Sequence, residues 1–189
     1  MKLGLKRGVV ELYDHDVLWE ENACEIIKLL KSIFGDNAID IQHIGSTAIK
    51  TIKAKPIIDI VVGINDFNLL EDIMYELNDN GIIHRPNNDM DEYKLFVIGD
   101  FEKDTRTHHI HVVKYDNVEW NNQLDFRDYL NNYHEEAKKY EELKIELMEK
   151  NKDNREKYTK NKEEYLLNTF EKAKEWKKNR RAGQNSLDV

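Results

Sequence analysis

Residues 56–64, Pro-Ile-Ile-Asp-Ile-Val-Val-Gly-Ile, constrain the fold more than any other segment of this chain. The run is apolar on both faces, as a strand in the middle of a sheet covered on two sides would be. Pro56 fits at its start, because the first residue of a strand need not donate a ladder hydrogen bond. Asp59 interrupts the run, and burying its charge costs several kcal/mol unless a partner compensates.

Periodicity places further elements around this strand. Apolar residues at helical spacing predict a helix that ends near Gly35, and Gly81 marks the end of another. From about residue 120, charged residues and tyrosines at helical spacing replace the strand formers. The predicted helices are 15–34, 67–80, 121–133, 134–150 and 153–178, and the predicted strands are 39–44, 56–64, 82–85, 93–99 and 107–115. Residues 180–189 are polar, and we expect them to be frayed.

This order predicts an α/β (α+β) fold with a mixed sheet and flanking helices. Residues 1–118 would form the α/β core and residues 119–189 a helical region packed on it, within one domain overall. No Gly/Ser/Pro-rich linker separates the two parts.

Composition excludes some classes of partner. The formal net charge is −8 and the pI about 5.4, so nothing in the overall charge attracts nucleic acid or an anionic membrane. No apolar run approaches the roughly 18 residues that a membrane span needs. The single cysteine, Cys24, lies in a helical pattern that favours a buried thiol. We expect a cytoplasmic protein with no nucleic-acid or membrane partner.

The candidate chemistry lies on two strands. Asp59 shares a strand face with Ile57 and Val61, and His109 shares one with His111. Two imidazoles at this spacing can both reach a metal ion or a phosphate. The alternative is structural: Asp59 would accept backbone hydrogen bonds or pair with a basic side chain, and the histidines would be a chance pair. The Gly45-Ser46 turn just upstream favours a phosphate and metal site.

Phosphate binding also needs cations. Lys55 precedes Asp59 with the same strand parity, and Arg155, Tyr158 and Lys162 share a helix face. Each alone is a typical solvated residue, but together they are plausible walls for a triphosphate. Similar groups are the pair Tyr140 and Lys144 and the segment 126–129, which contains Arg127.

Several motifs in order resemble the GrpB-like family, over roughly residues 9–170. The matching residues are Tyr13-Asp14, Trp19, His43-Ile-Gly-Ser-Thr47, Lys55-Pro-Ile-Ile-Asp59, His109-Ile-His-Val112, Phe126-Arg-Asp-Tyr-Leu130, Tyr140, Lys144, Arg155, Tyr158 and Lys162.

The resemblance implies a nucleotidyltransferase-type fold, in which a Gly-Ser turn grips a triphosphate and paired carboxylates on the next strand hold divalent ions. Here Val61 occupies the second carboxylate position and cannot bind a metal. His109 and His111 stand where a third acid is expected, and imidazole suits Zn²⁺ or Mn²⁺ better than Mg²⁺. The family's Pro-Gly after this turn is replaced by Lys50-Thr51, and Lys50 and Lys53 add positive charge there.

The function expected is transfer of a nucleotidyl group from a nucleoside triphosphate to a small acceptor. Gly45, Ser46, Lys55, Arg127, Arg155, Tyr158 and Lys162 would bind phosphate, and Asp59, His109 and His111 would hold Mg²⁺ or Mn²⁺, with Zn²⁺ as an alternative, or the histidines would act as general base. The first alternative is an inactive nucleotide- or partner-binding module, like the GrpB-type domain fused to dephospho-coenzyme A kinase. The second is a single-metal phosphohydrolase, for which the sequence lacks further ligands.

Overall fold

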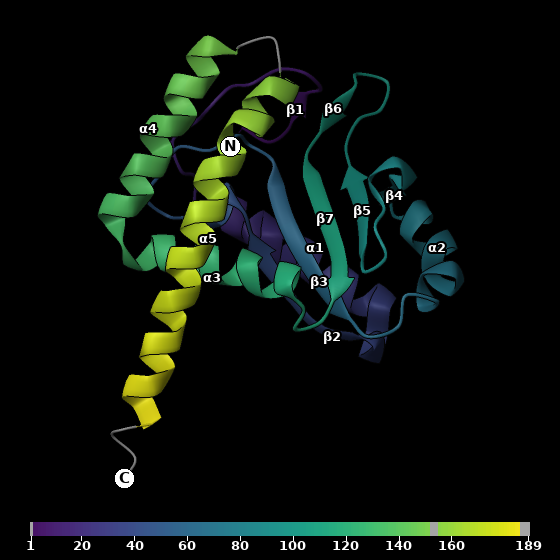
Figure 1. Cartoon of the computed structure of the whole chain (residues 1–189). Coiled ribbons are helices and arrows are strands. Elements are labelled where there is room, and N and C mark those ends of the chain that lie inside the picture. Colours follow the sequence, from purple (N-terminus) through teal and green to yellow (C-terminus); the bar gives the residue numbers. More distant parts are fainter. Residues whose placement is uncertain (1, 152–154, 186–189) are drawn as a thin grey trace.

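A five-stranded mixed sheet forms the centre of the computed structural model, which describes residues 2–151 and 155–185, without the side chains of 155–156 and 181–185. Its order is β2-β3-β7-β5-β4, and β3 runs parallel to β7 while the other neighbours are antiparallel. Helices cover both faces (Figure 1). The strands are β2 (Ala38–Ile44), β3 (Ile58–Ile64), β4 (Ile83–His84), β5 (Tyr93–Ile98) and β7 (His108–Lys114).

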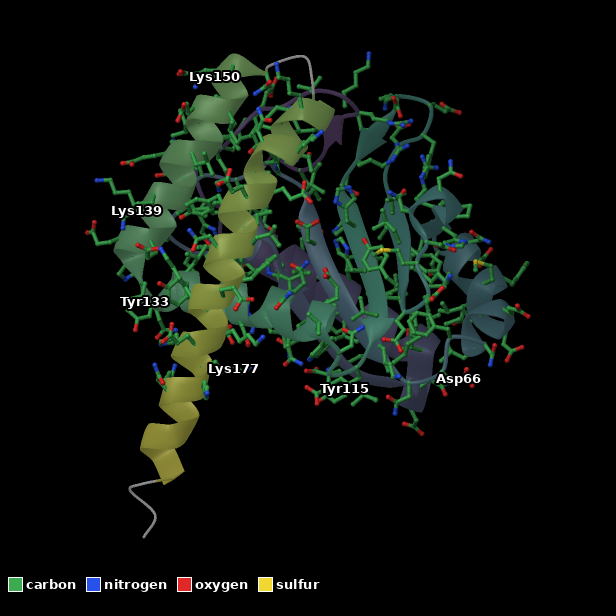
Figure 2. The ribbon with its side chains drawn as sticks, in the orientation of Figure 1. Asp66, Tyr115, Tyr133, Lys139, Lys150 and Lys177 are labelled. Carbon is green, nitrogen blue, oxygen red and sulfur yellow. The ribbon has the colours of Figure 1, made fainter. Side chains whose placement is uncertain are left out.

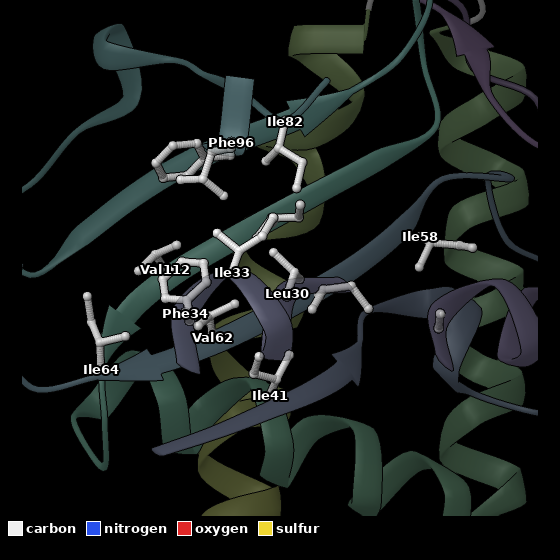
Figure 3. Close-up of a cluster of buried hydrophobic side chains, with 14 of the residues drawn as sticks. Leu30, Ile33, Phe34, Ile41, Ile58, Val62, Ile64, Ile82, Phe96 and Val112 are labelled. Atoms are coloured by element: carbon white, nitrogen blue, oxygen red, sulfur yellow. The ribbon is translucent and has the colours of Figure 1, made fainter. Parts of the chain in front are cut away.

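One face of the sheet carries the main apolar core. Helices α1 (Leu18–Phe34) and α2 (Leu69–Asp79) pack there. Because side chains alternate along a strand, Ile58, Ile60 and Val62 of β3 all point into this layer. Figure 3 shows α1 residues Leu30, Ile33 and Phe34 packed with side chains from the strands. Asp59 and Val61 are therefore left on the opposite face.

The opposite face is covered by α3 (Val118–Asn132), α4 (His134–Lys150) and α5 (Arg155–Asn185). Trp120 of α3 packs on Ile44, Val61 and Val113 of the sheet. A second apolar cluster joins the three helices to the loop after β2. Figure 2 shows Lys177 of α5 beside α3, where its ammonium contacts the Asp125 carboxylate. The helices α3, α4 and α5 are therefore held partly by contacts with the sheet and partly by contacts with one another.

The predicted α/β fold and its order of elements are confirmed. Helix α1 begins at Leu18, later than expected, because the Asp16 carboxylate accepts a hydrogen bond from the Leu18 amide at 3.0 Å in a turn. A two-stranded sheet of β1 (Leu5–Lys6) and β6 (Thr105–Arg106) was not predicted.

Two expectations were wrong. The Cys24 thiol is exposed, because the buried position in that turn of α1 belongs to Ala23. Residues 180–185 continue α5 rather than fraying, and residues 186–189 lie outside the described part. Among the described residues, no helix has the length and apolar character needed to cross a membrane.

Candidate functional site

Asp59, His109 and His111 converge on the face of β3 and β7 that α3, α4 and α5 cover. The parallel register pairs Asp59 with His109 and Val61 with His111, so the carboxylate lies between the two imidazoles. His109 Nδ1 donates to Asp59 Oδ1 at 3.0 Å, and His111 Nε2 lies 3.6 Å from the same oxygen. One ligand atom from each residue lies within 4.8 Å of the other two.

The two imidazoles explain how a carboxylate is tolerated here. Burial raises the pKa of Asp59, but the hydrogen bonds and charges of His109 and His111 outweigh it and hold the pKa well below its usual range. The Tyr93 hydroxyl lies 2.8 Å from Nδ1 of His111 and orients that ring. At metal sites, the ring nitrogen of a histidine that does not bind the ion commonly has a hydrogen-bond partner of this kind.

The turn after β2 fits tightly against Asp59. The antiparallel register places Ile44 opposite Asp59, so Gly45 passes directly beside the carboxylate. Gly45 has φ +71° and ψ −170°, and a Cβ there would lie 2.4 Å from Asp59 Oδ2. Only glycine fits this conformation and contact. Ser46 follows, with its Oγ 3.2 Å from the Tyr140 hydroxyl.

A cavity of about 360 Å³ joins the strand residues to the C-terminal helices. Its volume is within the range of small-molecule sites. The described residues that line it are Ile44, Gly45, Ser46, Lys55, Ile57, Asp59, His109, His111, Gln123, Phe126, Tyr140, Lys144, Tyr158, Thr159, Lys162, Leu166 and Phe170.

Lysines and tyrosines gather on one wall of the cavity, where α4 and α5 approach the segment before β3. The Lys55 and Lys162 ammonium groups lie 5.3 and 5.0 Å from the centre of the Tyr158 ring. Lys144 Nζ lies 4.6 Å from the centre of the Tyr140 ring and donates to the Lys53 carbonyl. Lys144 is only 1% exposed, and burial together with nearby Lys162 and Lys55 lowers its pKa to about 7, against the opposing charge of Glu141.

Most of the expected phosphate-binding residues meet in this cavity. Gly45, Ser46, Lys55, Tyr158 and Lys162 all line it. The ammonium groups of Lys55 and Lys162 both contact the Tyr158 ring, and the Arg155 side chain lies outside the described residues.

Arg127 is not among the described residues that line the cavity. Its guanidinium donates to Gln42, to the His43 carbonyl at 2.9 Å and to Asp128. Lys50 and Lys53 also turn elsewhere: Lys50 lies 3.5 Å from Glu20 and Lys53 pairs with Asp14. These three cations have carboxylate partners, as solvated surface cations often do.

Lys144, Tyr93 and Gln123 were missing from the predicted site. Lys144 was nevertheless named with Tyr140 among the possible walls of the phosphate site and among the residues that match the GrpB-like family, and both residues line the cavity. Tyr93 carried no signal, because its approach to His111 depends on the pairing of β5 with β7.

Three donors of this kind suit one transition-metal ion. Two imidazole nitrogens and a carboxylate oxygen match the preferences of Zn²⁺ or Mn²⁺ better than those of Mg²⁺. A second ion has no ligand at Val61, which is fully buried among Ile44, Val113 and Trp120. The described residues therefore fit a one-metal centre.

Comparisons with known proteins agree on one relationship. The family model described as "GrpB protein" matches residues 9–172. The chain is 39% identical to the glutamate-rich protein GrpB of Alkalihalophilus pseudofirmus, over 87% of this chain and 95% of that protein. It is 33% identical to UPF0157 protein YqkA of Bacillus subtilis over 94% of its own length, but it spans only 51% of that relative.

The crystal structure of conserved protein GrpB from Enterococcus faecalis superposes with a TM-score of 0.80 at 28% identity. The match covers 88% of this chain and 99% of that one. Sequence and structure together show that the chain belongs to the GrpB family.

Proposed function

We propose that this protein binds a nucleoside triphosphate with one divalent metal ion and transfers the nucleotidyl group to a small acceptor. The observation that carries the proposal is that Asp59, His109 and His111 share one cavity with three lysines. A ligand that satisfies both sets needs metal-binding oxygens and several negative charges, and a triphosphate has both.

Each residue has a role that follows from its position. Asp59, His109 and His111 would hold the metal, with Zn²⁺ or Mn²⁺ preferred to Mg²⁺. If the Tyr93 hydroxyl accepts a hydrogen bond from Nδ1 of His111, the other ring nitrogen keeps its lone pair for the ion. When bound, the metal would supply charge neutralisation at the phosphates.

Gly45 and Ser46 would orient the phosphates beside Asp59, and Lys55 and Lys162 would neutralise their charge. The acceptor hydroxyl would release its proton to water and its oxygen would attack the α-phosphorus. The bond from that phosphorus to the oxygen shared with the β-phosphate would break, and pyrophosphate would leave with that oxygen. A Gly-Ser turn beside a carboxylate on the next strand supports a nucleotidyltransferase-type site. A preorganised, positively charged cavity would stabilise the negative charge that develops on the phosphate oxygens in the transition state.

A second candidate is a module that binds nucleotide without reacting. The apolar surroundings of Val61 favour it, because they leave no ligand for a second ion. The two candidates differ in one product: the enzyme releases pyrophosphate and the module does not.

The test is a thermal-shift panel of nucleoside triphosphates with Mg²⁺, Mn²⁺ or Zn²⁺, followed by pyrophosphate detection in the presence of a small-metabolite extract. We expect stabilisation by a triphosphate with Mn²⁺ or Zn²⁺, loss of it in Asp59→Asn, and retention in the exposed control Asp79→Asn. Stabilisation without pyrophosphate would support the binding module. No stabilisation by any pair would refute both candidates.

A further inference from the structure

The α4–α5 side of the cavity gathers positive charge in an acidic protein. Lys55, Lys144 and Lys162 line it, while the chain as a whole has a formal net charge of −8. Asp59 is the only carboxylate among the described lining residues, and the two imidazoles already engage it. Positive charges gathered in one cavity repel one another, and an anion bound there would reduce that repulsion.

Lys144 is the least solvated of the three. Its side chain is buried against Tyr140, and its Nζ donates to a backbone carbonyl, Lys53 O, which carries no full charge. The charged and titratable groups that face it are Lys55 and Lys162, the carboxylate of Glu141, and the phenols of Tyr140 and Tyr158. Two cations thus oppose one carboxylate around a buried amine.

Tyr158 adds an independent observation. The residue is fully buried and lines the same cavity, and its hydroxyl has no hydrogen-bond partner among the described residues. Burying a hydroxyl without a hydrogen-bond partner is unfavourable, because the group loses its hydrogen bonds to water. The Lys55 and Lys162 ammonium groups lie 5.3 and 5.0 Å from the centre of its ring, so an anion held by these two lysines would lie close to this side chain.

We propose that Lys55, Lys144, Lys162 and Tyr158 form a metal-independent subsite for the terminal phosphates of the nucleotide, and that Lys144 takes up a proton when the phosphates bind. The inference rests on the proposed function for the identity of the ligand. Beyond the proposed function, it states that the terminal phosphates bind away from Asp59 and that the affinity for them depends on pH.

The proton uptake follows from the surroundings of Lys144. Because its pKa is lowered to about 7, most of the Lys144 amines are neutral at pH 8. Phosphate charge in the cavity reverses the effect of the neighbouring lysines and favours the ammonium form. Binding at pH 8 should therefore take up protons at Lys144, and polyphosphate affinity should rise as pH falls toward 7.

The test uses inorganic tripolyphosphate in EDTA, with the full chain, by calorimetry at pH 8 in two buffers of different ionisation enthalpy. We expect binding by the wild type, with more protons taken up than in Lys144→Met. Lys144→Met should bind about tenfold more weakly. Lys160→Met, which removes an exposed charge from α5, the helix that carries Lys162, should match the wild type.

Further variants separate this subsite from the metal centre. Asp59→Asn should keep metal-free tripolyphosphate binding, and Lys162→Ala, whose side chain is partly exposed, should weaken it about tenfold even if Lys144→Met does not fold. No binding by the wild type in EDTA, equal proton uptake in Lys144→Met, or loss of binding in Asp59→Asn would overturn the proposal. Tripolyphosphate binding without any metal-dependent nucleotide effect would refute the proposed function alone.

Discussion

Replacing Gly45 by alanine tests how closely the turn after β2 fits the Asp59 carboxylate. The new Cβ would lie 2.4 Å from Asp59 Oδ2 and 2.9 Å from Asp59 Cβ, so the carboxylate must leave the position it holds beside His109 and His111. The backbone at φ +71° and ψ −170° adds about 1–3 kcal/mol of strain for any side chain. Displacing a packed neighbour typically costs a further 1–3 kcal/mol or so.

The matched control is Gly81→Ala. Gly81 has nearly the same φ, +72°, but a Cβ there meets nothing within 4 Å. Its expected cost is the strain of positive φ alone, about 1–2 kcal/mol. In urea unfolding, the free energy of unfolding should therefore fall by about 1 kcal/mol more, or further, for Gly45→Ala than for Gly81→Ala.

The second assay is metal affinity by calorimetry with Zn²⁺ or Mn²⁺. Gly45→Ala should weaken it at least tenfold, and Gly81→Ala should leave it unchanged, because only the first displaces a proposed ligand. Equal unfolding free energies for the two variants, with equal metal affinities, would refute the close fit between the turn and the carboxylate.

Three further variants test single interactions. Tyr158→Phe removes a buried hydroxyl without a described partner, so thermal unfolding should show an equal or higher melting temperature; a loss above about 1 kcal/mol would reveal a hidden partner. His111→Ala should abolish the Mn²⁺ or Zn²⁺ stabilisation while circular dichroism stays native, and retained stabilisation would remove His111 from the metal site. Burial lowers the pKa of His108 to about 4, so the unfolded state binds more protons and the unfolding free energy should fall as pH drops from 6.5 to 4. Urea titrations of His108→Gln should show a weaker fall, and an unchanged pH dependence would contradict this origin.

Strand parity explains why much of the site could be predicted from the sequence. Alternation along β3 and β7 is local, so the shared face of His109 and His111 follows from spacing alone. Their meeting with Asp59 also needs β3 and β7 to pair in parallel with the observed register. A shift by one residue would have turned the histidines to the other face.

The helical residues were harder to predict because helical spacing gives an angular position but not the neighbouring element. Lys162 faces the cavity, whereas Arg127 turns to the edge of β2 and Asp128. Lys144 alone looked like a solvated cation, yet it is buried and donates to the Lys53 carbonyl, a contact between distant segments that no local pattern specifies. Cys24 is the opposite case: it was expected to be buried and is exposed, because its neighbour Ala23 takes the buried position in the same helical pattern.

The central claim is that Asp59, His109 and His111 hold one divalent metal ion in the cavity that receives the phosphates. Its most direct test is anomalous diffraction from crystals grown with Zn²⁺ or Mn²⁺ and a non-hydrolysable nucleoside triphosphate. The account predicts one anomalous peak about 2.0–2.2 Å from a ligand atom of each residue, with phosphate density toward Lys55 and Lys162. A peak elsewhere, or nucleotide outside this cavity, would contradict it.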